Sequence, residues 1–234
     1  MKLKVMKLSK YGIILKRLRT DDIELVRHWR NSPQITQFME YREYITPEMQ
    51  QKWFESVDNF ENFFFIIEYQ GRKIGLINSS KIEWDTVSSE GGIFLWDENY
   101  YETFVPVWAS LCLLESTYYV MGAGRSVIKT LRDNERAKKL NVHLGYEMMP
   151  GQEEEYNQSY LLTRDSFLKH SPKLIRAASM LAGPENSLHL LYFDRHDIES
   201  GLADFMKDRI RKEMIQEYSE SGDDRLYIFK PIKV

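Results

Sequence analysis

The sequence predicts a mixed α/β fold, in which helices cover one mixed sheet. Residues 62–69 and 73–82 are strand patterns joined by a tight turn at Gly71, which predicts an antiparallel hairpin. Two helix starts precede this hairpin. Residues 104–119 follow it as a helix that is apolar nearly all round, and such a helix normally packs against a sheet.

The chain before the hairpin predicts a first strand over residues 11–19. Thr20 then caps a helix over about residues 21–30, in which apolar side chains recur at helical spacing. Thr46-Pro47 starts a second helix that runs to about residue 57, because Thr is a favoured cap and Pro fits the first helical position.

After the hairpin the predicted order is strand, helix, strand, helix, strand. The strands are expected at residues 90–96, 125–132 and 156–164, and the apolar helix lies between the first two. The helix between the last two of these strands begins at Asp133, whose carboxylate can cap the free amides of the first turn. It ends at Gly145, because glycine readily adopts the left-handed conformation found at helix ends.

Beyond this point the pattern restarts with a helix, a strand, a long helix and a last strand, predicted at residues 172–181, 187–193, 194–218 and 226–229. The long helix begins at Asp194 or Asp197, either of which can cap it, and its apolar stripe extends to Tyr218. We therefore divide the chain into a domain of residues 1–165 and a C-terminal α/β extension of residues 166–234. The extension is either a small module or a layer packed on the first sheet.

The composition is that of an ordinary globular protein. Of the 234 residues, 43% are hydrophobic and 29% are charged, and the formal charge of −3 argues against a general nucleic-acid binder. Cys112 is the single cysteine, so we expect a buried thiol rather than a disulfide. No apolar run suits a signal peptide or a membrane span. We therefore predict a cytoplasmic protein with no metal site, no nucleic-acid partner and no membrane partner.

Short motifs spread from Leu18 to Met148 carry a family resemblance through their order and spacing. They are Leu18-Arg19, Asp22, Trp29-Arg30-Asn31, Ile45-Thr46, Gln50, Trp53-Phe54, Phe65-Ile66-Ile67, Gly71, Ile74-Gly75, Asn134-Glu135-Arg136-Ala137, Leu140 and Leu144-Gly145-Tyr146. In this pattern the chain resembles the GCN5-related N-acetyltransferases (GNAT). The similarity is to the branch that acetylates ribosomal-protein N-termini, antibiotics and amino sugars.

The resemblance implies a GNAT fold that binds acetyl-CoA, as co-substrate, where two parallel strands splay apart, here residues 90–96 and 125–132. Unpaired backbone groups would bind the pantetheine arm, and the pyrophosphate would lie at the start of the next helix. The cofactor-binding residues expected on this basis, with basic residues beside the cleft, are Phe94, Leu95, Trp96, Thr103, Phe104, Val105, Arg132, Asn134, Arg136 and Lys139. For the basic residues the alternative is a solvated surface, and for Asn134 it is a helix-start residue.

Two departures from the family pattern bear on activity. The turn that should contain two glycines falls on residues 102–106, which contain none. Side chains there block close approach of the backbone, Pro106 lacks an amide donor, and the Glu102 carboxylate repels phosphate. The tyrosine that protonates the leaving thiolate in the family is replaced by Asn141, which cannot act as an acid.

Amine acetylation also needs a base to free the amine lone pair. Glu83 and Glu90 flank the connection into the cleft and are the predicted catalytic bases, with Asp85 as a third option. For each of them taken alone, a surface carboxylate in a turn is the commoner case. Tyr118 and Tyr119 end the apolar helix and are candidates for the missing hydroxyl.

Arg30 and Asn31 close the first predicted helix, near the acceptor groove of the family. They are the predicted substrate-binding residues.

Two functions from different classes fit these features. The first is an N-acetyltransferase that moves the acetyl group of acetyl-CoA to a primary amine of a small molecule, such as an amino sugar, or to a peptide N-terminus. The second is a catalytically degenerate GNAT-fold protein that serves as a ligand-binding or protein-interaction module. The Asn134 motif favours the enzyme, and the glycine-free acidic turn favours the module. A homodimer fits either function.

Overall fold

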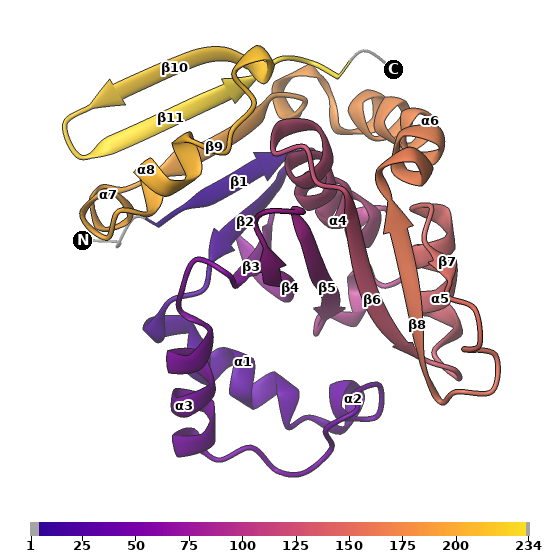
Figure 1. Ribbon diagram of the computed structural model, residues 1–234. Coiled ribbons are helices and arrows are strands. Elements are labelled where there is room, and N and C mark those ends of the chain that lie inside the picture. The colour runs from indigo at the N-terminus through magenta and orange to yellow at the C-terminus, as the bar shows by residue number, and fades with distance from the viewer. Residues whose placement is uncertain (1–4, 233–234) are drawn as a thin grey trace.

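The computed structural model describes residues 5–232, whose strands form one 11-stranded sheet (Figure 1). The strands are β1 (Lys7–Lys10), β2 (Ile13–Arg17), β3 (Phe63–Tyr69), β4 (Arg72–Glu83), β5 (Ser88–Leu95), β6 (Arg125–Leu131), β7 (Glu147–Met148), β8 (Asn157–Thr163), β9 (His189–Phe193), β10 (Ile215–Ser221) and β11 (Asp224–Phe229). Their order in the sheet is β10-β11-β9-β1-β2-β3-β4-β5-β6-β8-β7. Only β5 and β6 pair in parallel within the described chain. The predicted mixed sheet is confirmed.

The described helices include eight α-helices and several short turns. The α-helices are α1 (Ile23–Arg30), α2 (Pro33–Thr36), α3 (Pro47–Val57), α4 (Val105–Glu115), α5 (Glu135–His143), α6 (Arg164–Ala182), α7 (Arg195–Glu199) and α8 (Leu202–Lys207). The 3-10 turns are η1 (Thr20–Asp22), η2 (Glu98–Tyr100), η4 (Pro184–Asn186) and η5 (Lys212–Met214), and η3 (Ser116–Val120) is a π-helical turn that continues α4.

The two faces of the sheet carry separate hydrophobic clusters. Neighbouring residues of a strand point to opposite faces, and Ile66 and Ile67 of β3 accordingly belong to different clusters. Ile66 packs with α1, α2 and α3 through Val26 and Phe54. Ile67 belongs to the larger cluster, which includes nearly the whole of α4 together with residues of α6 and α8. The apolar periphery of α4 therefore reflects burial on all sides, as predicted.

The C-terminal extension continues the same sheet rather than forming a separate module. Strand β9 pairs antiparallel with β1, where Leu191 lies opposite Leu8, and β11 and β10 follow outward (Figure 1). Phe167 and Ile175 of α6 are buried in the same cluster as α4. The extension thus adds three strands to the edge of the first sheet, which differs from both predicted arrangements, a separate module and a layer packed on the sheet. The division near residue 165 stays a prediction, and it falls within the first turn of α6.

Two predictions for the extension are wrong in detail. The long helix from Asp194 is two short helices, because Gly201 adopts a left-handed conformation with φ of 79° between α7 and α8. Tyr218 lies in strand β10, whose pairing with β11 outweighs the helical pattern. Helix α6 begins at Arg164, well before the predicted start, and continues through Pro172.

Three further observations concern expectations from composition. Cys112 is a free, fully buried thiol, as predicted. Among residues 5–232, no helix combines the length and apolarity needed to cross a bilayer. No group of three His, Cys, Asp or Glu side chains in that range is arranged to hold a metal ion.

Candidate active site

The parallel strands β5 and β6 separate partway along their length. They pair from Ser88 opposite Arg125 to Gly91 opposite Ile128, yet β5 continues to Leu95. Strand β6 likewise continues to Leu131. Beyond the last pair, the facing edges of the two strands no longer bond to each other. This opening lies where the resemblance places the splay.

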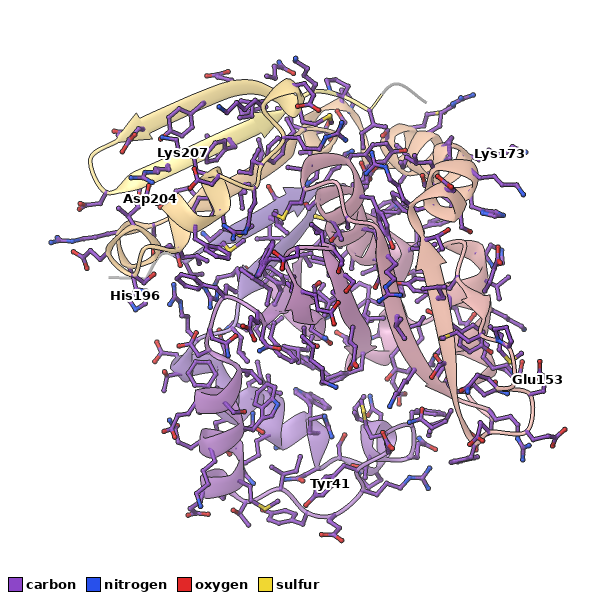
Figure 2. The ribbon with its side chains drawn as sticks, viewed as in Figure 1. Tyr41, Glu153, Lys173, His196, Asp204 and Lys207 are labelled. Carbon is purple, nitrogen blue, oxygen red and sulfur yellow. The ribbon has the colours of Figure 1, made fainter. Side chains whose placement is uncertain are left out.

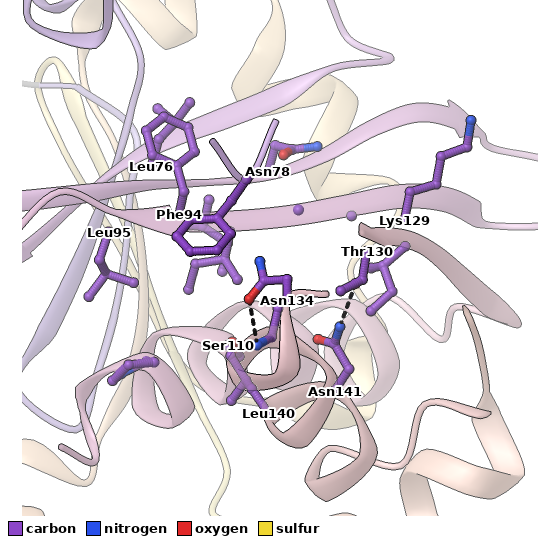
Figure 3. A pocket seen from close by; sticks show the side chains of 18 of the residues that line it. Leu76, Asn78, Phe94, Leu95, Ser110, Lys129, Thr130, Asn134, Leu140 and Asn141 are labelled. Carbon is purple, nitrogen blue, oxygen red and sulfur yellow. Dashed lines mark hydrogen bonds between the residues drawn. The ribbon is translucent and has the colours of Figure 1, made fainter. Parts of the chain in front are cut away.

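A cavity of about 940 Å³ occupies this opening. Helices α1 and α3 and the connection between α2 and α3 line one side, and α4 and α5 line the other. Figure 2 labels Tyr41, a lining residue on the connection after α2. Figure 3 shows side chains from β4, β5, β6, α4 and α5 converging on the same space.

Two consecutive glycines of β5, Gly91 and Gly92, leave the strand without side chains at these two positions beside the cavity. A Cβ atom at Gly92 would lie 2.9 Å from Oδ1 of Asn78, and one at Gly91 would lie 3.3 Å from Cγ2 of Ile128. Both glycines line the cavity, and sequence reasoning overlooked them. The available signal was a Gly-Gly pair inside a strand pattern, which often marks close approach of a ligand or another backbone.

Asn134 lies at the start of α5 and also on the wall of the cavity. Its Oδ1 accepts a hydrogen bond from the Ala137 amide at 3.1 Å, so Asn134 caps α5. Its side chain also lines the cavity (Figure 3). The helix cap is therefore Asn134 and not Asp133, because the Asp133 carboxylate instead accepts a hydrogen bond from the Tyr156 hydroxyl at 3.1 Å.

The predicted basic residues divide into two groups. Arg136 and Lys139 of α5 line the cavity, and the Arg136 guanidinium lies 3.7 Å from the ring centroid of Tyr101. Neither has an ion-pair partner among the described residues. Arg132 lies outside the lining, and its Nη1 is 3.7 Å from a carboxylate oxygen of Glu154.

The two predicted acceptor residues also separate. Arg30, the last residue of α1, lines the cavity. Asn31 does not, because its side chain bonds both backbone groups of Ile45, donating at 2.9 Å and accepting at 2.8 Å. Asn31 therefore fastens the end of α1 to the connection before α3. Gln50 of α3 lines the cavity as well and was not among the predicted site residues.

A family comparison agrees with this geometry. Residues 13–147, more than half of the chain, match the family model described as an acetyltransferase (GNAT) domain. The chain belongs to the GNAT acetyltransferase family. Acetyl-CoA is the acetyl donor in this family. The recognition made from short motifs is therefore confirmed.

Several solved structures share the GNAT fold. FdhC, an apo nucleotide-linked sugar GNAT, has a TM-score of 0.61 and 16% identity over 75% of this chain and 100% of that one. The Vibrio cholerae spermidine N-acetyltransferase in complex with CoA and spermine has a TM-score of 0.57 and 16% sequence identity. The match covers 67% of this chain and 98% of that one. RimL, a ribosomal L7/L12 alpha-N-protein acetyltransferase in complex with coenzyme A, has a TM-score of 0.57 and 17% sequence identity. The match covers 66% of this chain and 96% of that one. No curated protein matches the chain.

The start of α4 differs from the phosphate-binding turn that the resemblance implies. The Val105 amide donates to Oγ1 of Thr103 at 3.2 Å, and Pro106 has no amide hydrogen. Two of the first amides of the helix are therefore not free for a ligand. Thr103 and Glu102 line the cavity, whereas Phe104 and Val105 do not.

The predicted residues at the end of β5 lie in different environments. Phe94 and Leu95 line the cavity (Figure 3). Trp96 does not, because it is buried against α1, where its ring stacks on Trp29 with centroids 6.0 Å apart. Its indole N–H donates to the Lys73 carbonyl at 2.9 Å.

The side chains proposed to replace the missing tyrosine lie elsewhere. Asn141 is buried and donates to Oγ1 of Thr130 at 2.9 Å (Figure 3), so this position has a structural hydrogen bond and no acid. Tyr118 donates to the Leu162 carbonyl at 2.7 Å, and the Tyr119 hydroxyl faces Ser171 at 3.4 Å. Neither tyrosine lines the cavity, so the suggestion that they supply the hydroxyl is wrong.

Several other hydroxyl side chains line the cavity, and Ser110 and Tyr146 are two of the buried ones. Ser110 of α4 is buried, with its side chain on the cavity wall (Figure 3). Tyr146 is also buried and donates to Oγ of Ser126 at 3.2 Å. Burial raises the pKa of Tyr146 to about 12. The Tyr146 hydroxyl is therefore protonated at neutral pH, but its one proton is donated to Ser126, so it can donate to a ligand only by giving up that bond.

The two predicted bases lie just outside the cavity lining. Glu90 is on the same face of β5 as Gly92 and Phe94, because side chains alternate along a strand. Its carboxylate is partly exposed and lies 2.8 Å from Nζ of Lys81. Glu83 lies at the far end of the β4–β5 hairpin, where its carboxylate accepts from Oγ of Ser88 at 2.9 Å.

Proposed function

We propose that this protein is an acetyl-CoA-dependent N-acetyltransferase acting on a primary amine of a small molecule or on a peptide N-terminus. The observation that carries the proposal is the separation of β5 from β6 beyond Gly91, which opens a cavity with room on both sides of the strands. Two of the similar structures are named for acetylation of an amine, one a spermidine N-acetyltransferase and the other a ribosomal alpha-N-protein acetyltransferase, and a third is named as a nucleotide-linked sugar GNAT. Cytoplasmic location and a homodimer stay predictions.

The residues around the opening fit the parts of acetyl-CoA. Unpaired edges of β5 and β6 offer backbone groups to the amide-rich pantetheine arm. The Nδ2 group of Asn134 is a further donor, since its Oδ1 already caps α5. Arg136 and Lys139 offer positive charge to the phosphates, which compensates in part for the few free amides at α4. Acetyl-CoA supplies the activated thioester.

The proposed reaction is a direct attack of the amine nitrogen on the thioester carbon. A carbon–nitrogen bond forms, the carbon–sulfur bond breaks, and the amine proton leaves as the thiolate is protonated. We assign the proton-accepting role to Glu90, because its carboxylate is on the acceptor face of the sheet. Since this carboxylate is outside the cavity lining, it would accept the proton through a water molecule. Ser110 and Tyr146 are the hydroxyl groups that can hydrogen-bond the leaving sulfur.

One observation favours the second function, a binding module without catalysis. The start of α4 combines the Glu102 carboxylate with two amides that cannot bind phosphate. This arrangement weakens the site that usually holds the pyrophosphate, because anions are stabilised by free amides and positive charge. The module reading therefore predicts weak or absent cofactor binding.

Calorimetric titration of acetyl-CoA into the purified protein separates the two functions. The enzyme predicts saturable binding, thermal stabilisation, and release of free thiol when a panel of primary amines is added. A lack of both heat and stabilisation at millimolar acetyl-CoA contradicts the enzyme. Binding without thiol release for any amine supports the module.

A further inference from the structure

Two polar side chains on the acceptor side of the cavity have no hydrogen-bond partner. Arg30 of α1 has a buried Nε atom without a partner, and no carboxylate among residues 5–232 pairs with its guanidinium. Gln50 of α3 is only 4% exposed, and its Nε2 is also without a partner. Both residues line the same cavity, from two helices that pack together.

Such unpaired groups are unfavourable in a folded protein. A buried donor without a partner destabilises the folded state because it has lost its bonds to water, and a charged donor does so more strongly. Burial lowers the pKa of the Arg30 guanidinium, because the charged form loses hydration there and no nearby carboxylate restores it. An unpaired polar group at a cavity wall is instead a common feature of a binding site that is satisfied by its ligand.

The wall around Arg30 and Gln50 is apolar. The lining residues from α1, α2, α3 and the adjoining strands include Val26, Ile35, Ile45, Trp53, Phe64 and Leu76. Of the described residues that line the whole cavity, Glu102 alone carries a carboxylate, and it lies beside the start of α4. The acceptor side therefore has one positive group, one amide and a hydrophobic surface. It has no negative group to bind a polyamine.

We propose that the acceptor is an amino-acid-like molecule, in which the reactive primary amine is accompanied by a carboxylate and an apolar or aromatic body. The carboxylate binds the Arg30 guanidinium, with the Gln50 amide as a second donor, and the apolar body packs on the hydrophobic wall. This substrate class rests on the proposed acetyltransferase function. One guanidinium balances one negative charge, which favours a carboxylate over a doubly charged phosphate.

The position of Arg30 explains how such an acceptor is oriented. Arg30 belongs to the α1–α3 side, and the same cavity continues to the strand opening at Gly91 and Gly92. The amine and the carboxylate of an α-amino acid share one carbon atom, so a carboxylate bound to Arg30 also fixes the position of the amine, while the apolar body packs on the hydrophobic wall. Two hydrogen bonds to a guanidinium also fix direction as well as affinity, because the donors form a planar fork.

Direct binding tests the carboxylate site without requiring turnover. The probes are N-acetyl-L-phenylalanine and its amide, which share shape and differ by one negative charge, measured by calorimetry with the full-length protein. We expect the carboxylate to bind roughly tenfold to hundredfold more tightly than the amide, the range typical of hydrogen bonds to charged groups. Equal affinity for the two probes, or tighter binding of spermidine than of L-phenylalanine, overturns the proposal.

Variants locate the effect. Arg30→Met keeps an unbranched apolar stem but removes the guanidinium, and it should abolish the preference for the carboxylate while acetyl-CoA affinity stays unchanged. Gln50→Met should reduce the preference without abolishing it. Lys52→Met removes an exposed charge from α3 outside the cavity and should change nothing. A preference that survives Arg30→Met contradicts the assignment, and so does one that Lys52→Met removes.

The outcomes also separate this proposal from the acetyltransferase function. Binding of N-acetyl-L-phenylalanine that depends on Arg30, together with no acetyl-CoA binding, supports the carboxylate site and contradicts the enzyme. Acetyl-CoA binding with thiol release for amines that lack a carboxylate, such as phenethylamine, at the rate seen with L-phenylalanine supports the enzyme and contradicts the carboxylate site. A matched aminophosphonate analogue that reacts faster than L-phenylalanine assigns the anion site to phosphate and overturns the choice of carboxylate.

Discussion

Asn134 uses the two atoms of its amide group for different purposes. Oδ1 caps α5 through the Ala137 amide, and Nδ2 is left for a ligand in the cavity. A cap at this position fixes the start of the helix and with it the position of Arg136, which lies two residues further along and lines the cavity. In the proposed cofactor site, a structural role and a ligand-binding role would therefore coincide in one residue.

Replacing Asn134 by two different residues separates these roles. Asn134→Asp keeps a good capping oxygen but loses the N–H donor, so stability should be retained while acetyl-CoA affinity falls. Asn134→Ala loses both groups, so the free energy of unfolding should also fall, by about 0.5–2 kcal/mol. Urea denaturation and calorimetry measure the two effects. Wild-type affinity in Asn134→Asp would show that the residue is only a helix cap.

The two candidate bases are distinguished by their environments. Glu90 shares a strand face with Gly92, whereas Glu83 is held by Ser88 at the end of the hairpin. We expect Glu90→Gln to lower kcat by roughly a hundredfold, the lower end of the range for removal of a general base. Glu83→Gln should leave kcat within about twofold. The pH dependence of kcat provides the measurement, and the reverse order of effects would assign the base to Glu83.

At the scale of an element, the start of α4 decides how the protein can bind phosphate. The helix begins with an amide already bonded to Thr103, then a proline, and Glu102 lines the adjoining wall. Positive charge for the phosphates must therefore come from the side chains of α5 more than from the amides of α4. Because charged side chains of α5 replace backbone amides of α4 in this role, the affinity for the cofactor should depend on surface charges and hence on salt concentration.

Glu102→Gln tests this charge balance. The change removes the one carboxylate of the described cavity lining and leaves the backbone in place. Acetyl-CoA affinity should rise by several-fold at low salt, and the gain should shrink at 0.5 M salt because exposed charges are screened. Glu98→Gln, in the preceding turn and outside the lining, is the matched control. An unchanged affinity would place the phosphates away from α4.

At the scale of the whole molecule, a buried polar network joins the extension to the rest of the sheet. Lys10 and Tyr11, at the end of β1, both donate to the buried carboxylate of Glu115 in α4. One residue further along, Ser116 bonds Nε2 of His189 on β9 at 2.7 Å. The extension is thus tied to the helix that lies under the cavity, through groups that are costly to leave unpaired.

The buried His189 makes stability depend on pH. Burial holds the pKa of His189 well below 6.5, because the charged ring would lose its hydration, and the Lys10 charge lowers it further. The unfolded chain binds a proton near pH 6.5 that the folded protein does not bind. Stability that is present above this pH is therefore lost as the pH falls below it.

His189→Gln should remove this contribution. The loss of unfolding free energy between pH 6.5 and 5.5 should become smaller by up to about 1.4 kcal/mol per pH unit, the limit for one proton. Urea denaturation across this range measures the slope independently of any overall destabilisation. His143→Gln, at an exposed position of α5, serves as the control. Equal slopes for His189→Gln and the wild type would show that another group binds the proton.

The sequence by itself determined the local features of this protein. The order of strands and helices, the end of α5 at Gly145, the absence of glycine before α4 and the replacement by Asn141 all follow from residues a few positions apart. Capping, turn preference and hydrophobic period act over that distance. The same local reasoning failed for residues 194–218, where the left-handed Gly201 separates α7 from α8 and the pairing of β10 with β11 outweighs a helical pattern.

Only the tertiary structure decided which side chains face the cavity. Arg30 and Asn31 are neighbours in the chain, yet one lines the cavity and the other bonds Ile45. The opening of the strands after Gly91 and the pairing of β9 with β1 likewise depend on residues far apart in sequence. Contacts of this kind are set by packing of whole elements, which no local preference encodes.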